Sequence, residues 1–296
     1  MTLRVRVISP WFRELTTDQA FFSTQVPLET ADALLCDWAP SSELLRFPRR
    51  KAWYCCEPSH HFRELGGGRW PAMRRRLEEG EFLSHRNPRV EFRVPHKTHV
   101  GALEMNRSVK RLPRAVAIVS NHGGSPWRRH EDTTLRNRFV THPLVDLFGR
   151  RGWTEYRASR FSRKRTPANY KGEIPGDWPA AEKRRILSDY KVAVCLENVN
   201  EPNYFTEKFV EAVCAGCVPV YRPDEVTAAG SLAGAFWIDP RDHESDPGMT
   251  IAAALAQDLE SVQLRNLEWL MSNNELRATS HTGVYQRIAS ILVTGS

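Results

Sequence analysis

Short apolar runs recur along the chain and alternate with segments of helical spacing. Near the amino end, residues 3–9, 33–36 and 51–56 are partly β-branched runs that lead into loops, and helix candidates lie between them. Five further strand candidates follow, at residues 115–119, 145–149, 191–196, 217–221 and 236–239. Helices are predicted at residues 135–140, 180–188 and 251–272, and another over the last twenty-odd residues. This alternation predicts an α/β fold built on parallel sheets.

The stretch from residue 189 to 221 is the most informative part of this pattern. It predicts a strand, a loop, a helix and a second strand in direct succession. The first strand, residues 191–196, is apolar as expected for a sheet buried on both faces, and Glu197 and Asn198 end it with polar groups. Open α/β sheets bind ligands at this carboxyl edge. We therefore expect a ligand site there.

The helix after this loop has recognisable signals at both ends. Thr206 or Asn203 can cap its amino end, and Gly216 can supply the left-handed residue that follows its last turn. Its apolar positions share one face: Phe209, Val210, Ala212 and Val213.

Two charged residues, Glu207 and Lys208, stand in the first turn of that helix. A cation is unfavourable there, because unsatisfied N–H groups and the helix dipole make this end positive. A diphosphate on the helix terminus would resolve the conflict, and Glu207 could then accept hydrogen bonds from ribose hydroxyls. A solvated Glu–Lys pair on an ordinary helix stays open as well, because a misplaced cation costs only about 0.3–1 kcal/mol.

Three linked motifs run through this stretch. They read Tyr-Lys-x5-Glu-Asn, then Tyr-x-Thr-Glu-Lys-x3-Ala, then Gly-x-Val-Pro-Val-Tyr. Their matching residues are Tyr190, Lys191, Glu197, Asn198, Tyr204, Thr206, Glu207, Lys208, Ala212, Gly216, Val218, Pro219 and Val220. Together they resemble the donor-binding motif of the α1,3/1,4-fucosyltransferases, glycosyltransferase family 10. Leu196 and Val199 stand where phenylalanine and serine are commoner in that family.

The resemblance implies two Rossmann-like domains that face each other across a cleft, the GT-B type of α/β fold. We place an acceptor-side domain at residues 1–112 and a GDP-fucose-binding domain at residues 113–275, because the basic, polar stretch 104–114 separates two strand-bearing parts. Residues 276–296 then form a terminal helix, which in transferases of this type commonly crosses back to the first domain.

A second part of the resemblance concerns an arginine. Ser120-Asn121 is followed by Arg136-Asn-Arg-Phe139, as in the family pattern, and this implies that Arg136 faces the donor diphosphate. A guanidinium suits that role through bidentate hydrogen bonds to phosphate oxygens. Arg138 and the Arg128-Arg129 pair are competitors for it. The donor-binding residues implied are Arg136, Glu197, Asn198, Tyr204, Thr206, Glu207 and Lys208.

A carboxylate follows the apolar run 51–56, where Pro58 forces a turn after Glu57. In the fucosyltransferases the corresponding strand ends in a glutamate thought to act as catalytic base, so the resemblance implies that Glu57 is the general base. A cap of a helix or turn is the alternative role for Glu57. Competing bases in the neighbouring sequence are Asp37, His60, His61 and Glu64.

Composition limits the alternatives further. The 296 residues suffice for two domains, and the formal charge of +7, with clustered arginines, suits an anionic ligand, although solvated basic faces explain each cluster equally well. Of the six cysteines, only Cys214 and Cys217 have a metal-like spacing, so we expect free, packed thiols and no zinc site. No Asp-x-Asp is present, so the sequence requires no metal. No cofactor is expected either.

The chain is expected to be a soluble, bacterial-type catalytic part. Residues 1–10 contain no apolar signal core, and no run of about 18 apolar residues occurs, which predicts a cytoplasmic protein that is at most peripheral at the inner membrane. The expected reaction is an inverting transfer of fucose from GDP-fucose to a hydroxyl of an acceptor oligosaccharide or glycoconjugate, with an α1,3-type linkage. Alternatives are another nucleotide sugar, or a non-catalytic protein that binds nucleotides or nucleic acid, although aromatic RNA-reading motifs are missing.

Overall fold

The computed structural model describes residues 4–8, 22–23, 26–37, 41–54, 67–78, 105–108, 110–120, 131–149, 152–154, 156, 163, 165–174, 180–273, 276, 288 and 292. The chain divides into two compact units. Unit 1 comprises Met1–Pro95, Glu201–Tyr204 and Arg277–Ser296, and unit 2 comprises His96–Asn200 and Phe205–Leu276.

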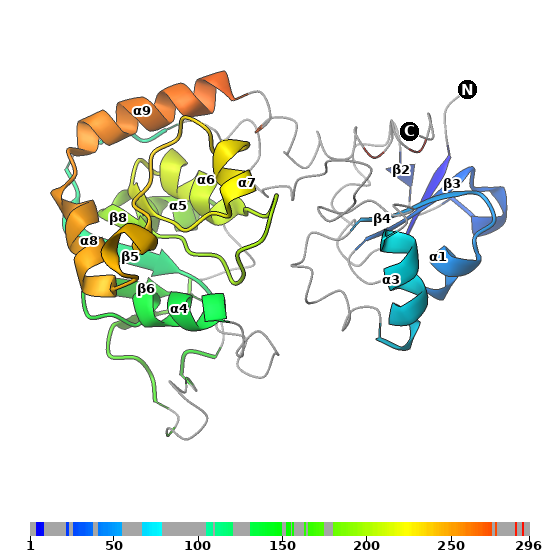
Figure 1. The fold of residues 1–296 in the computed structure, drawn as a ribbon, viewed down its shortest axis with the longest axis horizontal. Coiled ribbons are helices and arrows are strands. Elements are labelled where there is room, and N and C mark those ends of the chain that lie inside the picture. The colour runs from blue at the N-terminus through cyan, green and yellow to red at the C-terminus, as the bar shows by residue number, and fades with distance from the viewer. Residues whose placement is uncertain are drawn as a thin grey trace. The chain divides into compact units, whose positions relative to one another are not determined.

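Unit 1 contains a parallel sheet of four strands in the order β2-β1-β3-β4 (Figure 1). The strands are β1 (Val5–Ile8), β2 (Phe22–Ser23), β3 (Ala33–Asp37) and β4 (Arg50–Tyr54). Two helices, α1 (Ser42–Arg46) and α3 (Trp70–Glu78), and a 3-10 turn, η2 (Leu28–Thr30), accompany the sheet. Its core consists mainly of Leu34, Cys36, Leu44, Trp53 and Met73. The three strands predicted near the amino end are confirmed.

A short helical turn in this unit contains two glycines. Gly67 and Gly68 belong to the 3-10 helix η4 (Gly67–Arg69), which leads directly into α3. Gly67 has a φ of 51°, a value that glycine adopts at little cost. The turn therefore starts a helix at this point.

Unit 2 is built on a five-stranded parallel sheet in the order β7-β6-β5-β8-β9. The strands are β5 (Leu112–Ile118), β6 (Val145–Phe148), β7 (Tyr170–Gly172), β8 (Tyr190–Val194) and β9 (Val218–Val220). From β5 the chain builds outward to β7 and then returns to place β8 on the other side of β5. The strand order therefore reverses between β5 and β8, and a crevice at such a point is where doubly wound sheets bind ligands.

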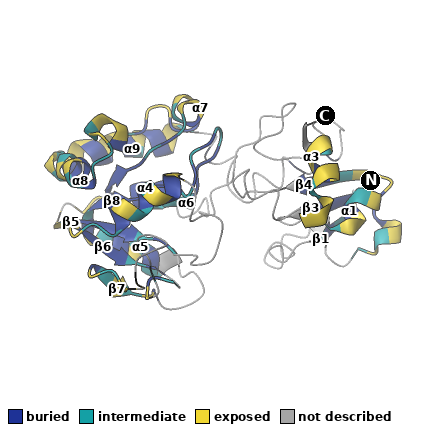
Figure 2. Ribbon diagram, turned by 60° about the horizontal axis from the view of Figure 1, so that its bottom comes forward, coloured by how far each residue is buried: buried dark blue, intermediate teal, exposed yellow. Residues whose placement is uncertain are grey.

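Helices cover both faces of this sheet, as Figures 1 and 2 show. They are α4 (Glu131–Val140), α5 (Ala180–Ser188), α6 (Glu207–Cys214), α7 (Glu225–Ala229), α8 (Pro247–Ala256) and α9 (Leu259–Ser272), with the 3-10 helix η7 (Pro240–His243). Alternate strand residues serve two separate cores. Ala193 packs with Phe209 of α6, whereas Val192 and Val194 pack with Phe139 of α4. Burial on both faces explains the continuous apolar runs of these strands.

The sequence misplaced three elements of unit 2. The helix predicted over residues 251–272 is two helices, because Asp258 breaks the run and caps α9 by accepting a hydrogen bond from the Ser261 N–H at 3.0 Å. The strand predicted at residues 236–239 is reduced to one isolated bridge between Val220 and Ile238. β7 is a short edge strand without an apolar pattern, and the sequence did not predict it. The helix over residues 180–188 is confirmed.

Gly216 ends α6 in the left-handed conformation that the sequence predicts, with a φ of 75°. A Cβ atom there would collide with the backbone oxygen of Asn106, because residues 105–108 lie close against this turn. We expect Gly216→Ala to lower the free energy of unfolding by more than about 2 kcal/mol, because a clash adds to a left-handed strain of about 1–2 kcal/mol. Urea unfolding followed by tryptophan fluorescence measures this.

Gly234 provides the matched control for that variant. It also has a positive φ, of 89°, but an added Cβ would meet nothing within 4 Å. Gly234→Ala should therefore cost only the conformational strain, about 1–2 kcal/mol. Equal losses in the two variants would show that the close approach of Asn106 does not matter.

Candidate functional site

The amino end of α6 is fixed by Thr206, one of the two caps that the sequence offered. Its side chain accepts a hydrogen bond from the Lys208 N–H at 3.4 Å, and its backbone is extended, with a φ of −118°. Asn203 instead lies in the preceding loop with a φ of 60°. Thr206 in turn donates to Glu197 Oε1 through both its N–H and its hydroxyl, each at 2.8 Å.

Glu197 is the centre of a buried polar cluster at the carboxyl end of β8. It is 5% exposed, and besides the two donors of Thr206 it receives the Tyr221 hydroxyl at 3.3 Å on Oε1 and the Lys208 ammonium at 2.7 Å on Oε2. A buried carboxylate is costly unless it is paired and hydrogen-bonded, and here it is both. Burial and the carboxylate of Glu197 together raise the pKa of the Tyr221 hydroxyl well above its usual value.

Lys208 therefore has an anionic partner within the protein. Its Nζ contacts Glu197 Oε2 and also lies 2.9 Å from the Thr206 hydroxyl, so the lysine is not part of a solvated pair. Burial lowers the pKa of Lys208, and the nearby Arg136 cation acts in the same direction, but attraction by Glu197 and Glu207 outweighs both and raises it. The ammonium thus stays charged in an enclosed place, beside the positive end of α6.

Arg136 reaches the same loop from α4. It is 5% exposed and donates to the side-chain oxygens of Asn198 and, at 2.9 Å, Asn137. Thr133, on the same helix, donates its hydroxyl to the Asn198 backbone oxygen at 2.8 Å. Arg136 and Lys208 thus contact adjacent residues, Asn198 and Glu197. Two cations that are far apart in the sequence are brought together at one sheet edge.

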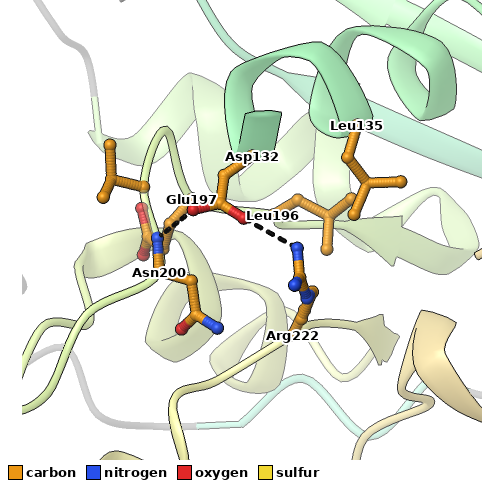
Figure 3. A pocket seen from close by; sticks show the side chains of 7 residues that line it. Asp132, Leu135, Leu196, Glu197, Asn200 and Arg222 are labelled. Carbon is orange, nitrogen blue, oxygen red and sulfur yellow. Dashed lines mark hydrogen bonds and ion pairs between the residues drawn. The ribbon is translucent and has the colours of Figure 1, made fainter. Parts of the chain in front are cut away.

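A pocket opens next to this loop (Figure 3). It is lined by Asp132, Leu135, Leu196, Glu197, Val199, Asn200 and Arg222. Asp132 bridges its two sides, because one carboxylate oxygen accepts from the Asn200 N–H and the other from the Arg222 guanidinium, both at 2.7 Å. Sequence reasoning missed Asp132 and Arg222. The acidic first turn of α4 is the one sequence signal that points to Asp132. Nothing in the sequence links it to Arg222, because the two residues come from separate segments.

A second pocket lies between the sheet and helices α5 and α6, and Lys183 and Lys208 both line it. Lys183 forms an ion pair with Glu211 of α6. Burial raises the pKa of Glu211 despite this lysine. Sequence reasoning also missed this pair, which joins α5 to α6 one turn beyond Lys208.

The remaining residues predicted for donor binding or catalysis lie in several parts of the chain. Tyr204 is buried, Glu207 is partly exposed, and Arg138 is exposed on α4. Asp37 is the last residue of β3. Glu57 lies outside the described residues, as do His60, His61, Glu64, Arg128 and Arg129.

Neither a metal cluster nor a membrane-spanning helix occurs in the described part of the chain. No group of three or more His, Cys, Asp or Glu side chains is placed there to hold a metal ion. None of the helices described combines the length and the apolar character needed to cross a bilayer. Four cysteines, Cys36, Cys195, Cys214 and Cys217, are free and buried, as predicted.

No protein-family model matches the chain, and no curated protein matches it. Several solved structures do match the chain. A crystal structure of an α1,3-fucosyltransferase aligns with a TM-score of 0.52 at 14% identity over 100% of this chain and 91% of that one. The fold is that of the GT-B glycosyltransferases. This result confirms the predicted α/β class with two parallel sheets.

Two further structures share this fold. The α1,3-fucosyltransferase with GDP aligns at 16% identity with a TM-score of 0.51, over 100% of this chain and 91% of that one. An α-glucosyltransferase in complex with UDP-glucose and DNA containing an abasic site aligns at 12% identity with a TM-score of 0.56, over 99% of this chain and 100% of that one. Structures that hold different nucleotides therefore match about equally well.

Proposed function

We propose that the protein is a glycosyltransferase that takes its sugar from a nucleoside diphosphate donor bound by unit 2. One observation carries the proposal: Arg136 and Lys208 are held on the adjacent residues Asn198 and Glu197, at the carboxyl end of β8 and beside the amino end of α6. A diphosphate carries the charge that two cations and a helix terminus attract. The edge of the sheet is also the one where such ligands bind.

Lys208 has capacity left for such a ligand. An ammonium has three N–H donors, and among the described residues two of them are directed at Glu197 and Thr206. In this proposal the third binds a phosphate oxygen. In this proposal Glu207, partly exposed in the first turn of α6, accepts hydrogen bonds from ribose hydroxyls. Thr206 and Glu197 are fully engaged with the protein, so in this proposal they hold the helix terminus in place.

The finer proposal is that the donor is GDP-fucose, and it rests on the three motifs of residues 190–221. A hydroxyl of an acceptor oligosaccharide or glycoconjugate attacks the anomeric carbon from the face opposite GDP, so the configuration inverts. Glu57 of unit 1 removes the proton from that hydroxyl as it attacks. Arg136, Lys208 and the helix terminus stabilise the charge that develops on the departing diphosphate.

A UDP-sugar is the second candidate donor. The likeness to an α-glucosyltransferase that was solved with UDP-glucose has a TM-score of 0.56, against 0.52 for the α1,3-fucosyltransferase. In this case the role of the diphosphate site is unchanged, and only the contacts to base and sugar differ.

The test is a thermal-shift screen with GDP, GDP-fucose, UDP and UDP-glucose. A ligand present at 100 times its dissociation constant adds about 2.7 kcal/mol to the stability, which a melting curve resolves easily. We expect GDP and GDP-fucose to raise the melting temperature and the uridine compounds to do so less. A reversed order supports the second donor. If no nucleoside diphosphate shifts the transition, the proposed function is wrong.

Arg136→Lys is expected to reduce turnover by about tenfold or more, although the positive charge is kept. Arg136 contacts Asn198 and Asn137 at the same time, and an ammonium cannot reproduce that planar fork. Each charged hydrogen bond lost is worth about 1.5–3 kcal/mol. Steady-state rates measure the effect. Arg138→Lys, at an exposed position on the same helix, is the control and should be neutral. Full activity of Arg136→Lys would place the diphosphate elsewhere.

A further inference from the structure

Three segments of unit 2 are joined at Asp132. This residue lies in the first turn of α4 and is 7% exposed. Its carboxylate accepts from the Asn200 N–H, at the end of the loop that follows β8, and from Arg222, which follows β9. Thr133 and Arg136, on the same helix, both donate to Asn198. Together with the bond between Asp132 and Asn200, three hydrogen bonds therefore join α4 to the loop of residues 198–200. Figure 3 shows the Asp132 bridge.

The backbone next to Arg222 is fixed by contacts of a second arginine. The backbone oxygen of the next residue, Pro223, accepts a hydrogen bond from Arg241 at 3.0 Å, and Arg241 is clamped on Asp239 at 2.6 Å. The Arg222 side chain is 26% exposed and extends from this fixed backbone to Asp132. Arg222 directly follows Tyr221, which ends the donor motif, so the resemblance assigns it no role.

We propose that Arg222 is a positioning residue of the donor site, and that it acts through Asp132. The inference rests on the proposed function. By holding Asp132, Arg222 sets the first turn of α4 against the loop after β8, and these two segments carry Arg136 and Asn198. The pair thereby fixes the distance between the Arg136 cation and the Lys208 cation on Glu197, which a diphosphate must span.

The charges around Arg222 indicate an indirect role. The pocket that it lines also contains the carboxylates of Asp132 and Glu197, and the guanidinium is already paired with the former. A phosphate that approached Arg222 directly would meet like charge from Asp132 and lose part of the attraction. Arg222 therefore acts by keeping Arg136 in position. It strengthens donor binding only while Asp132 is present.

A double-mutant cycle tests this coupling, with the dissociation constant of GDP measured by calorimetry on the full chain. We expect Arg222→Met and Asp132→Asn each to weaken GDP binding about tenfold, and the double variant to be no weaker than either single one. Direct contact of Arg222 with the donor would make the two effects multiply, and that result overturns the proposal. Unchanged GDP affinity in Arg222→Met overturns it as well.

The Arg114–Asp146 pair is the matched control. It has a similar geometry, 2.9 Å between guanidinium and carboxylate, and an equally buried aspartate, but both residues lie within strands β5 and β6. Arg114→Met should lower the melting temperature and leave GDP affinity as in the parent, which separates a loss of stability from a loss of positioning. Equal weakening of GDP binding in this control counts against the proposal.

A conservative variant of Arg222 and the parent protein itself provide two further tests. Arg222→Lys can still reach Asp132 with one hydrogen bond and should recover part of the GDP affinity; this variant also decides the matter if Arg222→Met does not fold. No recovery, in a folded Arg222→Lys protein, contradicts the proposal. If the parent protein binds no nucleoside diphosphate at all, the proposed function fails first, and the inference fails with it.

Discussion

Glu57→Gln is expected to lower the rate of transfer to a saturating acceptor by about 10²–10⁴-fold while the affinity for GDP stays near that of the parent. An inverting transfer needs one base on the acceptor side, and a glutamine of the same shape cannot take a proton at that point. β4 ends at Tyr54, three residues before Glu57 in the sequence, and it is parallel to β3, so Tyr54 lies at the carboxyl edge of this sheet.

Initial rates at saturating donor and acceptor measure this effect, and the pH dependence adds a second criterion. The acidic limb of the pH–rate profile reports ionisation of the base and should flatten in Glu57→Gln. Glu64→Gln and Asp37→Asn serve as matched carboxylate controls from the same unit. A variant of Glu57 that keeps more than about a tenth of the parental rate falls well short of the range for a base, and one of the controls would then be the better candidate.

The sequence predicted the β8–α6–β9 core because all of its signals are local. Apolar runs define the two strands, Thr206 is a good cap, and Gly216 accepts the left-handed conformation. Each of these properties belongs to one residue and its nearest neighbours along the chain. The structure follows them closely.

Contacts between distant segments were beyond such reasoning. The unfavourable position of Lys208 signalled an anion, but its nearest anion is Glu197, which reaches it only because the intervening loop folds back on α6. Asp132 and Arg222 meet across the sheet edge without any sequence pattern that links them. Short elements such as β7 were not predicted for another reason. They pair through backbone atoms and need no periodic apolar pattern in the sequence.

Lys208→Met gives the second large effect that we expect: GDP binding weakened roughly 10- to 150-fold, as follows from losing a charged hydrogen bond of about 1.5–3 kcal/mol. Turnover should fall further, by about 10²–10³-fold, because the ammonium also stabilises charge on the leaving diphosphate. Calorimetry with GDP and steady-state rates measure the two effects.

The ion pair complicates this variant, since removing Lys208 also leaves the Glu197 carboxylate buried without its cation, at 5% exposure. Breaking such a pair can destabilise a protein by about 3–5 kcal/mol. A loss of GDP binding in Lys208→Met alone would therefore not distinguish a phosphate contact from damage to the cap of α6. Lys191→Met controls for the loss of a motif lysine, because its Nζ donates to the Leu255 backbone oxygen at 2.7 Å, and GDP affinity should be unchanged.

The decisive comparison adds Glu197→Gln to Lys208→Met. Glutamine keeps an acceptor for the Thr206 N–H and hydroxyl and removes the unpaired charge, so the double variant should regain most of the stability lost in the single one. If Lys208 serves only to neutralise Glu197, GDP affinity should return along with stability. We expect affinity to stay low, because the third donor of the ammonium belongs to the diphosphate. Parental GDP affinity in the double variant would reduce Lys208 to a structural residue and leave Arg136 as the cation of the site.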